Sequence, residues 1–258
     1  FTGQGWHPLL YPVLYAAQCA LVGYLIWRYR RLMPELTLRF HWLALVVGVA
    51  MAVVWVYLGQ MVTHWERLRE LGITAFTQEL WQWTWHPTDA QRWSTPDNAE
   101  HYFAAMPEAI RWPSLGLRLL GMSIIVPLCE EIFMRSLLLR SFRSLRQTGI
   151  GCLQVLQDLP MIGDWIMHTQ LARRANRHEY AFGAQFVHTP LGQMTAFSVI
   201  FTSLLWMFAH APRDYAATFV CGVAYCLLLR ATHKHGLGPV IWAHGITNAL
   251  LWGYTLHT

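Results

Sequence analysis

Two adjacent carboxylates, Glu130 and Glu131, lie inside an apolar stretch, and Arg135 follows one helical turn later. The stretch runs from Leu115 to Leu139. A charged residue at the centre of a bilayer-spanning helix costs roughly 2.5–3.5 kcal/mol on insertion scales. A helix with a purely structural role avoids that cost with leucine or alanine. The pair therefore indicates a functional site that faces the interior of a helical membrane protein.

The composition agrees with a membrane protein. The chain has 258 residues, of which 55% are hydrophobic and 13% charged, against about 25% charged in soluble domains. Most of its apolar segments reach the roughly 20 residues that cross a bilayer, and an open strand cannot satisfy its backbone in lipid. The predicted fold is therefore all-α, a polytopic transmembrane helical bundle with about six spans and a polar intramembrane catalytic cavity. The six segments are about 9–27, 41–61, 114–138, 191–210, 215–230 and 237–256.

The basic residues between these segments predict the topology. Basic residues, nearly all of them arginine, occur in residues 28–39, 140–190 and 230–234, which share one side if all six segments cross. By the positive-inside rule that side is cytoplasmic, as expected for a multi-pass protein of a bacterial inner membrane. The Arg173–Arg174 pair is expected to meet anionic lipid. No basic stripe alternates with aromatic residues, so nucleic-acid binding is not expected.

We expect one structural domain with two regions. Residues 1–113 form an N-terminal two-span region with a long outer loop, 62–113, that is rich in tryptophan. Apolar spacing over residues 76–83 predicts an amphipathic interfacial helix, either an anchor or a lid. Residues 114–258 form the catalytic core and include the polar inner loop 140–190, which could hold a short helix.

The two adjacent carboxylates are predicted to have different roles. On a helix, Glu131 and Arg135 are i, i+4 neighbours and can pair. Glu130 points about 100° away and is not committed to that arginine. Glu131 is thus expected to be structural, and Glu130 is left available as a general base or acid.

Two further polar groups lie on apolar segments. His210 ends the run 197–209, and His244 and Asn248 share one helical face at i, i+4 spacing. Hydrolysis of an amide needs a base for the water, a second group to hold it and donors for the oxyanion. Glutamate with histidine can perform the first two tasks, and histidine with asparagine the third.

Other interpretations of the same residues are open. Glu130, His210 and His244 could bind zinc, although no HExxH spacing is present. The polar cluster could instead pack the helices of a non-enzymatic immunity or scaffold protein, or form a proton relay in a transporter. Cys129 could be a nucleophile, but no histidine lies beside it in the sequence. No metal and no cofactor are expected.

The order of these groups resembles a known family. EExxxR, then aromatic-xxxH, then HxxxN, each on a membrane helix, is similar to the CAAX protease and bacteriocin-processing family of glutamic intramembrane proteases, which includes the type II CAAX prenyl endopeptidases. The resemblance covers about residues 115–258 and implies hydrolysis of a peptide or protein substrate at the membrane, without an obligatory metal. It implies that Glu130 activates water with help from His210 and that His244 and Asn248 support the oxyanion. It also implies that the site is shaped by Glu131, Arg135 and Trp206.

The chain departs from the family pattern in two places. Trp206 stands where phenylalanine is usual, and the inner loop 140–190 lengthens the distance between the first two motifs. The fourth segment also places His210 near the end of its span, whereas Glu130 lies mid-span. Because a catalytic pair needs similar depth, we expect that segment to start later and run past Pro212, or to tilt or re-enter. The oligomeric state and the substrate are not predicted.

Overall fold

The computed structural model describes residues 10–70, 103, 106–177 and 179–256. These residues form helices and connecting turns, and no strand occurs among them. The all-α prediction is therefore confirmed. The greater part of the outer loop 62–113, including its predicted interfacial helix, lies outside the described residues.

Each of the six predicted apolar segments coincides with a helix. The first two are α1, Leu10–Tyr29, and α2, Trp42–Glu70, joined through the short helix η1, Arg30–Leu32. Within the described ranges, two helices are long and apolar enough to cross a membrane, Trp42–Met61 and Pro212–His235. The count of six spans stays a prediction. The helix Ala196–Phe208, for example, is apolar but shorter than a span.

The third segment is part of one uninterrupted helical rod. It begins as α6, Glu108–Leu120, and ends as α8, Leu139–Ser141. Between them, α7, Val126–Glu131, is flanked by two π-helical stretches, η2 and η3. Such π-bulges change the direction of side chains and are frequent at functional sites. The bounds of these stretches are Gly121–Ile125 for η2 and Ile132–Leu138 for η3.

The fourth segment is shorter than predicted. Helix α13 spans Ala196–Phe208, and it begins there because Thr195 and Ser198 form a capping box. The helix ends before Pro212, which begins the short helix η4, Pro212–Asp214. His210 therefore lies in the turn after α13. Of the two predicted alternatives, a later start with continuation past Pro212 is wrong, because the helix starts later but ends before the proline. A tilted or re-entrant segment stays a prediction.

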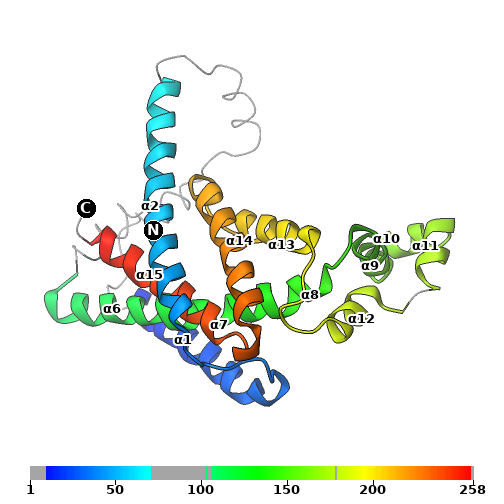
Figure 1. The fold of residues 1–258 in the computed structure, drawn as a ribbon, viewed down its shortest axis with the longest axis horizontal. Coiled ribbons are helices and arrows are strands. Elements are labelled where there is room, and N and C mark those ends of the chain that lie inside the picture. Colours follow the sequence, from blue (N-terminus) through cyan, green and yellow to red (C-terminus); the bar gives the residue numbers. More distant parts are fainter. Residues whose placement is uncertain (1–9, 71–102, 104–105, 178, 257–258) are drawn as a thin grey trace.

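The last two helices complete the bundle. Helix α14, Tyr215–Thr232, packs against α13 and α2, and α15, Gly238–Thr255, packs against α2 and η2. The short helix η5, His233–His235, connects them. Figure 1 shows α2 and α14 side by side, with α15 crossing beside the rod. The buried core between these helices includes Trp206, Tyr225, Leu229, Val240 and Ala243.

A glycine sets the approach of α15 to the rod. A Cβ atom at Gly245 would collide with the carbonyl oxygen of Ser123 in η2. By contrast, a Cβ at Gly253, on the same helix, would have nothing within 4 Å. Close packing at Gly245 brings the polar residues of α15 next to the carboxylates of α7.

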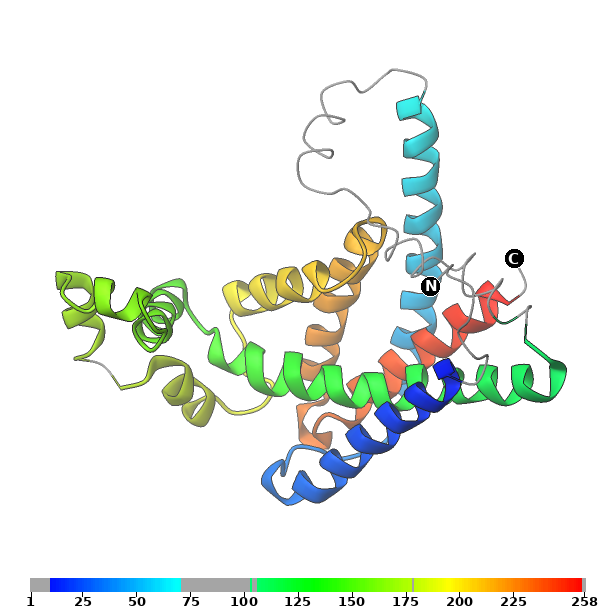
Figure 2. The ribbon, with the colours of Figure 1, turned by 180° about the vertical axis from the view of Figure 1, so that it is seen from behind.

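The predicted inner loop is largely helical. It contains α9, Leu145–Gln157, α10, Ile162–Ile166, α11, Gln170–Ala175, and α12, Ala181–His188. We call these four helices the arm. Both ribbon views show it projecting away from the rest of the bundle (Figures 1 and 2). At its base, Arg140 donates to the carbonyl of Thr189 at 2.7 Å and pairs with Glu35 at 3.2 Å.

Candidate active site

The predicted catalytic residues line one cavity. Glu130, His210, His244 and Asn248 lie in its wall, and its volume is about 400 Å³. They come from α7, the turn after α13, and α15, which are far apart in the sequence. Helices α1, α2, α6 and α14 contribute further side chains. The wall also includes Tyr15, Trp55, Arg118, Trp206 and Tyr225.

Glu131 is fully buried between two basic side chains. Its Oε2 lies 3.1 Å from Nε of Arg135, and its Oε1 lies 2.8 Å from Nδ1 of His244. The contact with Arg135 is an ion pair without hydrogen-bond geometry, since neither atom has a hydrogen-bond partner. The predicted i, i+4 pair is therefore present, and Glu131 has a second contact, with His244, that the sequence does not predict.

Arg135 is buried in an aromatic enclosure. Its guanidinium carbon lies 4.4 Å from the ring centroid of Trp206 and 5.5 Å from that of Tyr225. Its NH2 group also reaches the carbonyl of Gly222 at 3.5 Å. Cation–π contacts and the ion pair with Glu131 together compensate the buried positive charge.

Glu130 is held differently from its neighbour. Its side chain is 30% exposed, whereas that of Glu131 is 0% exposed. The indole Nε1 of Trp206 donates a hydrogen bond to Oε2 of Glu130 at 2.7 Å. The same oxygen lies 4.0 Å from Nε2 of His244, too far for a direct hydrogen bond. Glu130 is thus oriented by one donor while its carboxylate faces the cavity.

His244 has one nitrogen committed and one directed to the site. Nδ1 contacts Glu131 at 2.8 Å, an interaction that selects the tautomer with a proton on Nδ1. The ring stacks on Tyr225 with centroids 5.5 Å apart and meets the edge of Trp206 at 5.4 Å. These contacts fix the plane of the imidazole, so that Nε2 is the atom nearest Glu130.

His210 reaches the same cavity through Trp206. Its Nδ1 lies 2.9 Å from the backbone oxygen of Trp206, and the two rings are 5.3 Å apart. The His210 ring also contacts the ring of Trp55, with the two centroids 6.1 Å apart. No hydrogen bond joins His210 to Glu130 in the part of the chain that the structure describes. The two predicted partners therefore line one cavity, and Trp206 contacts both.

Asn248 is fixed by the rod. Its Nδ2 donates to the carbonyl of Met122 at 2.9 Å, within the π-helical stretch η2. A primary amide carries two N–H groups and one acceptor oxygen. One N–H therefore positions the side chain, and the remaining groups belong to the cavity wall.

Sequence reasoning missed several residues of the cavity wall, among them Tyr225 and Arg118. Tyr225 stacks on His244 and donates to Thr247 at 2.7 Å, yet nothing in the sequence distinguishes it from other aromatic residues of apolar helices. Arg118 lines the cavity. It could have been found, because it is a charged residue in the same apolar stretch as Glu130.

The described residues contain no preformed zinc site. Among the described residues, no group of three or more histidine, cysteine, aspartate or glutamate side chains is arranged to hold a metal ion. The carboxylate of Glu131 is already occupied by Arg135 and His244.

Comparison with models of protein families gives a match. A family model described as type II CAAX prenyl endopeptidase Rce1-like matches residues 165–250. No curated protein and no solved structure matches the chain. The matched range contains His210, His244 and Asn248, whereas Glu130 and Glu131 precede it. Over residues 165–250 the chain is therefore similar to the type II CAAX prenyl endopeptidases, a family of membrane-embedded proteases, and this supports the resemblance carried by its three motifs.

Proposed function

We propose that the chain is an intramembrane endopeptidase that hydrolyses a peptide bond with a water molecule activated by Glu130. The observation that carries this proposal is the convergence of Glu130, His210, His244 and Asn248 on one cavity. Each motif alone suits helix packing. Their meeting from separate elements supplies the base, the second polar group and the donors that amide hydrolysis needs.

Glu130 acts as the general base in this proposal. The attacking water lies between Oε2 of Glu130 and Nε2 of His244, which are 4.0 Å apart and suited to a bridging water. Trp206 holds the carboxylate so that it does not rotate away from the water. His210, on the other side of Trp206, assists by ordering solvent and substrate at the cavity wall.

In this proposal His244 is an imidazolium that donates from Nε2 as well as Nδ1, and together with Asn248 it supports the developing oxyanion. The Nδ1 contact with Glu131 and the Asn248 contact with Met122 fix both side chains before substrate arrives. Donors held in place reorganise little during the reaction, which is the main source of transition-state stabilisation in such sites. Glu131 and Arg135 are positioning residues, since they act through His244 and the helix packing.

The substrate of this proposal is a membrane-associated, lipidated or tagged protein. A cavity that opens among apolar helices admits a peptide from the bilayer or its surface. The proposed location is a bacterial inner membrane, with the arginine-rich loops in the cytoplasm as the positive-inside rule predicts. Membrane lipid is therefore the expected surrounding, and nucleic acid is not an expected partner.

The test compares two matched carboxylate variants. Mass spectrometry of membrane peptides is run on cells with the native chain, with Glu130→Gln, and with Glu108→Gln. Glu108 is exposed at the start of α6, so its variant controls for the loss of a charge. Cleavage products should disappear only with Glu130→Gln, by about 10²–10⁴-fold. If a folded Glu130→Gln variant gave as much cleavage product as the native chain, the hydrolase hypothesis would be rejected. The hypothesis of a non-enzymatic immunity or scaffold protein would remain.

The zinc alternative is tested on the purified protein. Activity in lipid is measured before and after exhaustive chelation, with metal analysis of the same sample. The proposal expects full activity from the chelated protein. Loss of activity that returns with zinc would assign the reaction to a metal protease built on the same residues.

A further inference from the structure

The arm carries large apolar side chains that contact little of the protein. The most exposed are Met161 at 84%, Trp165 at 80% and Leu145 at 73%. Val187 and Leu171 are also exposed. In water, such a surface on a projecting element favours aggregation. Such a surface is typical of an element whose apolar side chains lie against lipid.

The turn before α10 is built to present one of these side chains outward. Met161 has φ 67°, in the left-handed region that glycine occupies without penalty. The turn is tightly closed, since Gly163 donates to the carbonyl of Leu159 at 2.8 Å and a Cβ at Gly163 would collide with the backbone of Gln157. A glycine at position 161 would relieve the backbone. Because the Met161 side chain is exposed, packing within the chain does little to offset the strain of its backbone.

Within the described ranges, the arginines of the arm have no carboxylate partner, as is also the case for Arg31, Arg39 and Arg230 outside it. In the bundle, Arg135 and Arg140 pair with carboxylates. Over the described residues of the arm and its two ends, none of the arginines forms an ion pair with a carboxylate. They outnumber the acids of the same region, which are Asp158, Asp164 and Glu179. These unpaired arginines are Arg143, Arg146, Arg173, Arg174 and Arg177.

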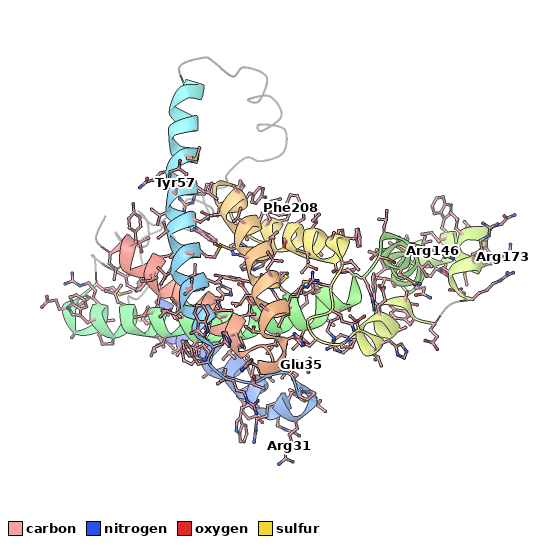
Figure 3. All side chains as sticks on the ribbon, in the orientation of Figure 1. Arg31, Glu35, Tyr57, Arg146, Arg173 and Phe208 are labelled. Carbon is pink, nitrogen blue, oxygen red and sulfur yellow. The ribbon has the colours of Figure 1, made fainter. Side chains whose placement is uncertain are left out.

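Figure 3 shows the labelled Arg146 and Arg173 on this projecting part of the molecule. Arginines and exposed apolar residues therefore occur together on one element. Mixed surfaces of this kind lie in the plane of a membrane interface, with the apolar side chains below the headgroups and the cations beside lipid phosphates.

We propose that the arm is a membrane-surface anchor that binds anionic phospholipid. Met161 and Trp165 enter the boundary between headgroups and acyl chains, and Arg173 and Arg174 contact the phosphate groups. This inference concerns the arm alone and is independent of hydrolysis. It holds equally for a chain with Glu130→Gln, so its failure and that of the proposed function are distinguishable.

The experiment measures hydrogen–deuterium exchange of the arm in the full chain. The protein is placed in nanodiscs of phosphatidylcholine alone, or of phosphatidylcholine with phosphatidylglycerol. We expect residues 159–175 to exchange more slowly with phosphatidylglycerol. The double change Arg173→Gln with Arg174→Gln should remove that difference in exchange rate. Each arginine is expected to contribute roughly a fivefold increase in the affinity of the arm for the anionic surface. Arg111→Gln, which removes a paired arginine of α6 outside the arm, should retain it.

A second variant separates lipid contact from folding. Met161→Gly relieves the left-handed backbone, so its melting temperature in detergent should equal or exceed that of the native chain, while protection of the turn decreases. Equal exchange in both lipids would overturn the proposal. So would protection by phosphatidylglycerol that survives the double arginine change, or protection that requires an added protein partner.

Discussion

The indole nitrogen of Trp206 donates a hydrogen bond to Glu130 at 2.7 Å, from a helix that lies far along the chain from α7. The family pattern usually has phenylalanine at this position, and phenylalanine has no such donor. The exchange therefore adds a direct contact to the proposed base. It also keeps an aromatic face over Arg135 at 4.4 Å.

Trp206→Phe should lower kcat by about ten- to a hundredfold and leave KM nearly unchanged. A hydrogen bond to a charged group contributes about 1.5–3 kcal/mol, and each 1.36 kcal/mol is tenfold in rate. Steady-state kinetics on a cleaved peptide measures both constants. Trp252→Phe, at a buried tryptophan outside the cavity, is the control and should keep its kcat. Equal effects of the two changes would reduce Trp206 to a packing residue.

The main effect of Glu131→Gln should be a lower free energy of unfolding, and any effect on the catalytic step should be secondary. Removing one partner of a buried ion pair costs about 3–5 kcal/mol, because Arg135 is left 1% exposed without its carboxylate. Glu130 is partly exposed, so Glu130→Gln should change the free energy of unfolding far less. Thermal unfolding of both variants in the same detergent measures the difference. The same loss of stability in both would contradict the division of roles between them.

Gly245→Ala should displace α15 from the rod. The added methyl group meets the Ser123 carbonyl, and overpacking of this kind costs about 1–3 kcal/mol. His244 and Asn248 move with the helix, so activity should also fall. Gly253→Ala, where nothing lies within 4 Å, is the matched control on the same helix. Melting temperature and turnover are measured together, and similar values for the two variants would show that the close approach does not matter.

Asn248→Ala should reduce kcat more than substrate binding. Removal of one preorganised oxyanion donor costs about 10²–10³-fold in kcat. The change also frees the carbonyl of Met122, which Asn248 contacts at 2.9 Å. Kinetics across a substrate series separates kcat from KM, with thermal unfolding as a check on folding. A change confined to KM would place Asn248 in substrate binding and not at the oxyanion.

Local patterns predicted the helices and one contact of the site. Apolar runs predicted all six segments, and the i, i+4 spacing predicted the pair of Glu131 with Arg135, because both depend on neighbours within a helical turn. The start of α13 could have been found from Thr195 and Ser198, since a capping box is also local.

The contacts that distinguish Glu130 from Glu131 depend on tertiary structure. Trp206 meets Glu130, and His244 meets Glu131, across separations of 76 and 113 residues. No periodicity within one helix specifies which ring faces which carboxylate, because that choice follows from how α13 and α15 pack against α7. The sequence by itself determined that an apolar helical protein carries a costly cluster of polar residues. Only the tertiary structure decided which carboxylate is enclosed as a fixed charge and which one faces the cavity.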